Sequence, residues 1–141
     1  MTDAEPPARV GDWIALYGSL MRGLEGAVAL ALGDRLRYVG PCILPGELFD
    51  LGAYPALRPG NGRVVGELHA LRDLEALKSL DAFEDFRPSE PRASVYLRER
   101  VELLEPKGAQ AWVYVYNTVP DARRRIPSGD WRAELETRTT P

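Results

Sequence analysis

The stretch that decides the fold is Ser94–Tyr116, which reads SVYLRERVELLEPKGAQAWVYVY. In Ser94–Leu104, aliphatic residues alternate with tyrosine, arginine and glutamate, and in Gln110–Tyr116, alanine and valine alternate with aromatic residues. Alternation with a period of two is typical of β-strands. Pro106-Lys107-Gly108 lies between the two segments and is typical of a turn. The stretch therefore predicts two strands joined as a hairpin.

Further strands and two helices are predicted on the N-terminal side of this hairpin. Proline and glycine residues in Tyr54–Gly62 predict the link of a second hairpin. Short connections favour antiparallel pairing, and strands occupied on both faces favour a curled sheet. The fold class is therefore α+β, a small mixed, mostly antiparallel β-barrel with flanking helices. The predicted strands are Trp13–Tyr17, Cys42–Asp50 and Val64–Leu71, and the predicted helices are Gly23–Leu36, with Leu24, Val28 and Leu32 as its stripe, and Leu74–Phe83, with Asp73 as its N-cap.

The chain has 141 residues, of which 45% are hydrophobic and 28% charged, which is typical of one globular domain. Residues 1–10 are expected to form a flexible arm, residues 11–133 the domain, and residues 134–141 a polar tail.

The net charge of −3 argues against nucleic acid or an anionic membrane as a partner. The N-terminus has neither a basic region nor an adjoining apolar run, so we expect no signal peptide. The single cysteine, Cys42, favours packing and a reducing, cytoplasmic location. The single histidine, His69, has no second ligand for a metal nearby, so packing is favoured over a role as catalytic base. Arg123–Arg125 is interpreted as a solvated turn, with an anion site as the alternative.

Glu84 is the candidate catalytic residue. On a helix it falls on the same stripe as Leu74, Leu77 and Leu80, because positions three, four and seven residues apart share one face. A carboxylate on an apolar face is costly unless it is paired or used, and desolvation raises its pKa toward the value suited to proton transfer. The alternatives are an exposed helix end or an ion pair with Arg87 or Arg98. Asp81, one turn earlier, is expected to make a structural hydrogen bond.

The loop Tyr17-Gly18-Ser19-Leu20 follows a buried strand. Gly18 is expected to adopt a backbone conformation that other residues avoid, so that the N–H groups of Ser19 and Leu20 converge on one point as an oxyanion or anion site. An ordinary turn at the end of a strand is the alternative. Ser19 is a poor nucleophile candidate because no triad context surrounds it.

These residues resemble those of the γ-glutamylcyclotransferase-like family, which includes the AIG2-like and butirosin-pathway cyclotransferase proteins. The likeness runs from about Ile14 to Trp131. It rests on the order and spacing of several motifs rather than on any one of them. The motifs are Tyr17-Gly18-Ser19-Leu20, Val65-Gly66-Glu67-Leu68, Leu80-Asp81-Ala82-Phe83-Glu84, Tyr96-Leu97-Arg98-Glu99-Arg100-Val101, Ala111-Trp112-Val113-Tyr114-Val115-Tyr116 and Ile126-Pro127-Ser128-Gly129-Asp130-Trp131.

The resemblance implies a small barrel with a cavity at one end, in which the α-amine of a γ-glutamyl group attacks its own γ-carbonyl. Products would be 5-oxoproline and a free amine or amino acid. Glu84 then matches the acid/base glutamate, the Tyr17–Leu20 loop matches the substrate-binding turn, and Tyr96 matches a tyrosine of the pocket wall. No cofactor or metal is required, and the partner would be a small γ-glutamyl molecule, with the oligomeric state left open.

Two positions depart from the family pattern. Asp85 stands where a glycine often follows the glutamate, which adds a negative charge and affects how the helix ends. Leu20 stands where the branch acting on free γ-glutamyl amino acids has asparagine, which favours a bulkier or protein-like γ-glutamyl amine. Two other functions stay open, namely a ligand- or partner-binding module without turnover and a tailoring enzyme that removes a γ-glutamyl protecting group.

Overall fold

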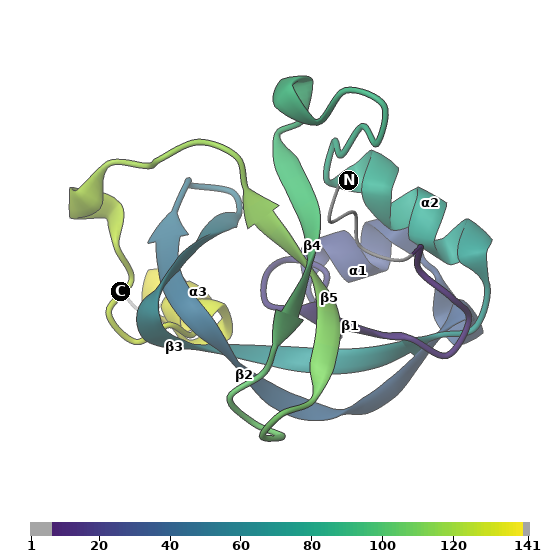
Figure 1. Ribbon diagram of the computed structural model, residues 1–141. Coiled ribbons are helices and arrows are strands. Elements are labelled where there is room, and N and C mark those ends of the chain that lie inside the picture. The colour runs from purple at the N-terminus through teal and green to yellow at the C-terminus, as the bar shows by residue number, and fades with distance from the viewer. Residues whose placement is uncertain (1–6, 140–141) are drawn as a thin grey trace.

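The computed structural model describes residues 7–139, so residues 1–6 of the predicted arm and 140–141 of the predicted tail lie outside it. Figure 1 shows a curved sheet with α2 and α3 near opposite ends of the long β2–β3 ribbon. None of the helices in the described range is long and apolar enough to cross a membrane. The strands are β1 (Trp13–Leu16), β2 (Leu36–Asp50), β3 (Pro55–Leu71), β4 (Tyr96–Glu102) and β5 (Gln110–Tyr116); the α-helices are α1 (Glu25–Leu30), α2 (Leu74–Phe83) and α3 (Trp131–Thr139); and the short 3-10 helices are η1 (Gly33–Arg35), η2 (Pro91–Ala93) and η3 (Ala122–Arg124).

The sheet has the order β2-β3-β1-β5-β4. All neighbouring strands are antiparallel except β1 and β5, which are parallel. The predicted α+β class with a mixed, mostly antiparallel sheet is therefore confirmed, but the sheet of the described residues does not close into a barrel. The N–H of Ile43 reaches across to the carbonyl of Glu105 at 2.8 Å. Pro41 and Pro45, two residues to either side, carry no N–H with which to extend this contact.

The predicted helix Leu74–Phe83 is confirmed as α2 with these bounds. The side chain of Asp73 caps it by accepting a hydrogen bond from the Ala76 N–H at 2.7 Å. Leu77 and Leu80 are buried against the sheet, whereas Leu74 is 44% exposed, so the buried stripe begins one turn later than the sequence predicts. This helix carries the candidate acid into the body of the molecule.

The predicted helix over 23–36 is wrong in length. It ends after one and a half turns, because Ala31 and Gly33 adopt left-handed backbone conformations with φ of +48° and +55°. Val28, expected in the buried stripe, is 72% exposed. Leu36 already belongs to β2 and pairs with Leu71 of β3. After α1 the chain therefore runs through the short helix η1 directly into β2 instead of continuing as one helix.

The predicted hairpin link at Tyr54–Gly62 is also misplaced. The turn lies at residues 51–54, where the Leu51 N–H donates to the Tyr54 carbonyl at 3.0 Å. Residues 59–62 lie within β3 at a bulge, where the pairing jumps from Glu47–Arg58 to Pro45–Arg63. Their prolines and glycines serve a bulge in a long strand rather than its end.

The hairpin of β4 and β5 is confirmed, with β4 shorter at both ends than the sequence predicts. In β4 the buried residue is Tyr96, while its neighbour Val95 is 42% exposed. In β5, Ala111 to Val115 are all buried, because this strand lies between β1 and β4 inside the sheet and is covered on both faces.

α3 runs through residues that the sequence analysis assigned to the tail from 134 onward. The Asp130 side chain accepts a hydrogen bond from the Ala133 N–H at 3.1 Å and begins the helix. Gly129 precedes it with φ of +65°, and a β-carbon there would lie 2.1 Å from the Arg63 carbonyl oxygen. Trp131 is fully buried in the core. The helix was not predicted because its other residues are almost all polar.

Candidate active site

Glu84 stands at the C-terminal end of α2. The Phe86 N–H donates to the Asp81 carbonyl at 2.8 Å and the Asp85 N–H to the Ala82 carbonyl at 3.2 Å, the two bonds of a Schellman motif. This motif needs a left-handed residue after the cap, and Asp85 supplies it with φ of +52°. The glycine expected there from the family resemblance is the residue that adopts this conformation most readily. Asp85 thus ends α2 with the same kind of turn that a glycine at this position would form.

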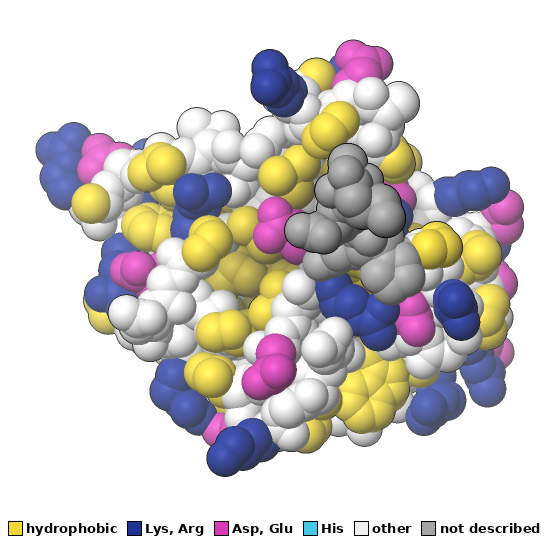
Figure 2. Space-filling model, in the orientation of Figure 1, with side chains coloured by type: hydrophobic (Ala, Val, Ile, Leu, Met, Phe, Trp, Pro, Cys, Tyr) yellow, Lys and Arg dark blue, Asp and Glu magenta, His cyan; other side chains and the backbone are white. Residues whose placement is uncertain are grey.

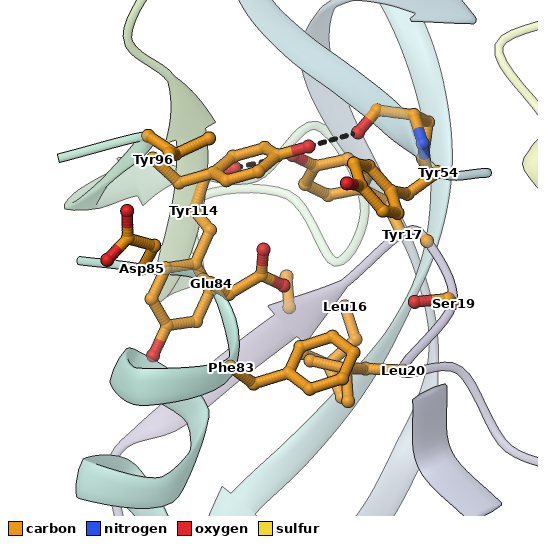
Figure 3. Close-up of a pocket in the computed structure, with 14 residues that line it drawn as sticks. Leu16, Tyr17, Ser19, Leu20, Tyr54, Phe83, Glu84, Asp85, Tyr96 and Tyr114 are labelled. Atoms are coloured by element: carbon orange, nitrogen blue, oxygen red, sulfur yellow. Dashed lines mark hydrogen bonds between the residues drawn. The ribbon is translucent and has the colours of Figure 1, made fainter. Parts of the chain in front are cut away.

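The side chain of Glu84 lines a cavity of about 290 Å³ (Figure 3). The structure places the other predicted site residues, Tyr17, Gly18, Ser19, Leu20 and Tyr96, in the wall of the same cavity. Segments from β1, the loop after it, α2, β4 and β5 meet there. On the face shown in Figure 2, hydrophobic side chains gather near the centre, and most Lys and Arg side chains lie toward the periphery.

Burial raises the pKa of Glu84 from its ordinary value to about 7. Desolvation causes this shift, because it penalises the charged form of a carboxyl group. Among the described residues no hydrogen bond or ion pair engages the Glu84 carboxyl group. The two arginines considered as partners are used elsewhere, since Arg87 Nε lies 3.2 Å from Asp85 Oδ1 and Arg98 Nε lies 3.1 Å from Asp81 Oδ1. The ion-pair alternative for Glu84 is therefore not realised.

Asp81 makes the structural contacts that the sequence analysis expected. Its Oδ1 accepts a hydrogen bond from the Tyr114 hydroxyl at 2.6 Å in addition to the Arg98 contact. Burial raises its pKa, while Tyr114 and Arg98 partly offset this effect. Asp81 thus links α2 to β4 and β5, one turn before Glu84.

The loop after β1 lies in the cavity wall, and two of its backbone N–H groups are unused in the part of the chain that the structure describes. Among the described residues, the N–H groups of Ser19 and Leu20 have no hydrogen-bond acceptor, although both residues line the cavity. The expected special conformation of Gly18 is wrong, since its φ is not positive. Glycine serves there to make space, because a β-carbon would lie 3.0 Å from Cγ and Cδ of Pro55.

Gly26 supports the loop in the cavity wall without lining the cavity itself, and it is absent from the predicted site. A β-carbon at this position would lie 2.6 Å from Ser19 Oγ, 2.8 Å from the Ser19 carbonyl oxygen and 3.0 Å from Cζ of Phe83. The Ala27 N–H also donates to the Ser19 carbonyl at 3.0 Å. α1 therefore holds the loop from behind at a distance that only glycine allows. The signal was a lone glycine within a helical pattern.

The hydroxyl groups of the two predicted tyrosines are engaged in the cavity wall. Tyr17 donates to the Tyr114 carbonyl at 2.6 Å and accepts from the Leu57 N–H at 3.3 Å, and Tyr96 donates to the Pro55 carbonyl at 2.7 Å. Burial raises the pKa of both hydroxyl groups, so they remain protonated donors. They fix the shape of the cavity, while its titratable group near neutrality is Glu84. Tyr54, Pro55, Phe83 and Tyr114 also line the cavity, and no local sequence pattern predicts them there.

Other reactive side chains lie away from this cavity. Cys42 is buried, and burial raises the pKa of its thiol to about 12, so it stays protonated at neutral pH. His69 is buried beside Glu67. Over residues 7–139, no three histidine, cysteine or acidic side chains gather in a way that would hold a metal ion.

The chain is similar to known proteins over most of its length. The family model "Gamma-glutamyl cyclotransferase, AIG2-like" matches residues 14–133. The gamma-glutamylcyclotransferase family protein YtfP of Escherichia coli K12 is 39% identical over 85 residues. These residues make up 60% of this chain and 66% of YtfP, so the match spans just under two thirds of that relative's length.

Two solved structures share the fold. The solution structure of ytfP from Escherichia coli is 31% identical and superposes with a TM-score of 0.62, covering 87% of this chain and 98% of that one. The crystal structure of an AIG2-like protein from mouse is 22% identical with a TM-score of 0.67, covering 87% and 89%, and shows likeness of fold alone.

Proposed function

Because the chain belongs to the AIG2-like gamma-glutamyl cyclotransferase family, we propose that it cyclises γ-glutamyl compounds to 5-oxoproline and releases an amine or amino acid. One observation carries the proposal. The unpaired Glu84 carboxyl group, with a pKa of about 7, shares a cavity with the free N–H groups of Ser19 and Leu20.

The first step is a proton transfer. Glu84 in its ionised form takes a proton from the α-ammonium group of the γ-glutamyl substrate and leaves a free amine. A carboxyl group with a pKa near the working pH is suited to this task, because both of its protonation states are accessible. Nucleophile and electrophile belong to the same molecule, so holding the substrate folded supplies much of the acceleration.

The second step closes the ring. The amine nitrogen bonds to the γ-carbonyl carbon, and the carbonyl oxygen becomes an oxyanion. The N–H groups of Ser19 and Leu20 are donors for this oxygen or for the substrate carboxylate. The protonated Glu84 then gives its proton to the leaving nitrogen as the original amide bond breaks. The ring nitrogen, which still carries two protons, gives one of them to the Glu84 carboxylate, so that 5-oxoproline is left neutral at nitrogen. The released amine takes up that last proton through water, which regenerates the carboxylate and frees both products.

The test is to measure 5-oxoproline release from γ-glutamyl amino acids, γ-glutamyl alkylamines and ε-(γ-glutamyl)lysine. Glu84→Gln should abolish turnover. Glu75→Gln is the matched control, because Glu75 is an exposed carboxylate on the same helix. Circular dichroism confirms that each variant is folded. Full activity of Glu84→Gln would refute its role, and silence of the folded wild type on every substrate would favour a binding module without turnover.

A further inference from the structure

A second cavity of about 330 Å³ lies beside the first, separated from it by Leu16 and Leu20, which line both. The segment 22–36, which fails to form the predicted continuous helix, makes its outer wall. Most of its lining is aliphatic, and Arg22, Tyr38 and His69 are its polar members.

His69 is the polar group of this cavity that lacks a full set of partners. It is 5% exposed, and its Nε2 lies 3.2 Å from Glu67 Oε1. Its Nδ1 is buried, with no hydrogen-bond partner in the part of the chain that the structure describes. Buried polar atoms nearly always have a partner, so an unsatisfied one within a cavity wall indicates where a ligand atom binds.

The protonation state of Glu67 decides which kind of atom fits. Burial raises the pKa of Glu67, but hydrogen bonds from His69 and the Arg22 N–H, together with the charges of Arg22 and of a protonated His69, more than offset it, so the pKa lies below its ordinary value. The carboxylate is therefore ionised and can only accept. When the His69 ring is neutral, Nε2 carries the proton in this contact, which leaves Nδ1 as an acceptor. A ligand of the neutral ring must therefore supply a donor.

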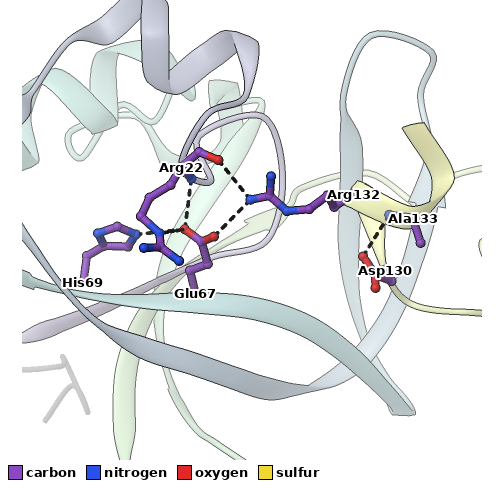
Figure 4. A network of polar contacts seen from close by, with 6 residues as sticks. All are labelled: Arg22, Glu67, His69, Asp130, Arg132 and Ala133. Carbon is purple, nitrogen blue, oxygen red and sulfur yellow. Dashed lines mark hydrogen bonds and ion pairs between the residues drawn. The ribbon is translucent and has the colours of Figure 1, made fainter. Parts of the chain in front are cut away.

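The charges around Glu67 exclude a cationic donor. Arg132 lies 3.0 Å from Glu67 Oε2 and Arg22 lies 3.5 Å from Oε1, so two guanidinium groups surround one carboxylate (Figure 4). The Arg22 guanidinium also stacks on the Tyr38 ring, 3.3 Å above its centroid. An ammonium group placed here would meet an excess of positive charge. A neutral hydroxyl group supplies the donor without this repulsion.

We propose that this second cavity binds a small neutral hydroxyl compound of the phenol type, with the hydroxyl group donating to His69 Nδ1 and the ring against the aliphatic wall. A cavity of about 150 Å³ is enough for benzene, so the volume accommodates one substituted ring. Tyr38 packs edge-on against His69 with ring centroids 5.5 Å apart. Because Nδ1 is buried, this cavity-lining ring has to turn aside when the hydroxyl group binds. The site is independent of the proposed reaction.

The experiment uses the full chain and two probes, phenol and anisole. The two share a ring and an oxygen, but anisole has no donor. Because the chain has one histidine, the imidazole signals in a ¹⁵N NMR spectrum all belong to His69, and only its two nitrogens have to be told apart. Phenol should bind saturably, move the Nδ1 resonance upfield and bind about tenfold more tightly than anisole, the effect of one satisfied buried hydrogen bond.

Two variants locate the binding. Ala27→Phe, which adds a ring to the cavity wall, should abolish phenol binding, whereas Glu84→Gln should retain it. Equal affinities for phenol and anisole, an unmoved Nδ1 resonance, or loss of binding in Glu84→Gln would each overturn the proposal. If Ala27→Phe does not fold, the difference in affinity between phenol and anisole on the wild type still tests the proposal.

Discussion

Asp85 holds the left-handed backbone conformation that ends α2 immediately after Glu84, with φ of +52°. Residues other than glycine adopt this conformation at a cost in free energy, so the turn after α2 is strained. Asp85→Gly should relieve the cost and raise the free energy of unfolding by about 0.5–1 kcal/mol. Denaturant unfolding measures the change, and 5-oxoproline release should persist.

Arg87→Ala is the control for the lost side chain of Asp85. The Asp85–Arg87 ion pair is exposed, and exposed pairs contribute little to stability. Arg87→Ala should therefore leave unfolding almost unchanged. A loss of stability in Asp85→Gly would show instead that the aspartate side chain, and not the turn, is what the position requires.

The features that the sequence predicts correctly depend on neighbours in the chain. α2 is an example, because the Asp73 cap and the Leu77–Leu80 stripe are both local signals. The break at Ala31 is not local, since alanine is the best helix former. The sequence also indicates that a glycine matters in the Tyr17–Leu20 loop, but not that Gly18 makes room for Pro55. That contact joins residues far apart in the sequence.

The same limit applies to the site. Helical spacing places Glu84 correctly on the inner side of α2, and the cavity around it depends on the fold. The hydroxyl groups of Tyr17 and Tyr96 bond to the carbonyl groups of Tyr114 and Pro55. These bonds join different strands, and no pattern within a single segment reveals them.

Gly26→Ala should lower turnover and lower the free energy of unfolding by no more than about 2 kcal/mol. The added methyl group meets Ser19 at 2.6 Å and must push the loop and α1 apart. This costs about 1–3 kcal/mol, while alanine returns about 1 kcal/mol of helix propensity. Displacing the Ser19 and Leu20 N–H donors should lower kcat/KM for 5-oxoproline release at least about tenfold.

Gly40→Ala is the matched control, because a β-carbon there has no atom within 4 Å and its φ is not positive. It should leave turnover unchanged. If Gly26→Ala were as active as Gly40→Ala, the position of the Ser19 loop would not matter for the reaction.

The pH dependence of turnover should follow Glu84. As the ionised form is the one that accepts the α-ammonium proton, kcat/KM should fall as the pH decreases below about 7. Phe83→Ser opens the cavity wall to water, and desolvation is the cause of the raised pKa of Glu84. The fall of kcat/KM on the acid side of the pH profile (its acid limb) should therefore move to lower pH in this variant. The substrate's own titration is the same for both enzymes, so a limb that does not move would belong to the substrate and contradict the assignment to Glu84.

The same raised pKa predicts how stability depends on pH. In the unfolded chain the pKa of Glu84 lies near its ordinary value of 4.5, whereas in the folded protein it is about 7. Between these values the unfolded state binds fewer protons, so the wild type loses stability as the pH rises through this range. The full difference corresponds to about 3 kcal/mol. Glu84→Gln, which cannot ionise, should match the wild type below pH 4.5 and exceed its free energy of unfolding above pH 7, as measured by denaturant unfolding. A difference in free energy of unfolding between the two proteins that does not change with pH would show that Glu84 has the same pKa in the folded and unfolded states. That result would refute proton transfer by Glu84 at neutral pH.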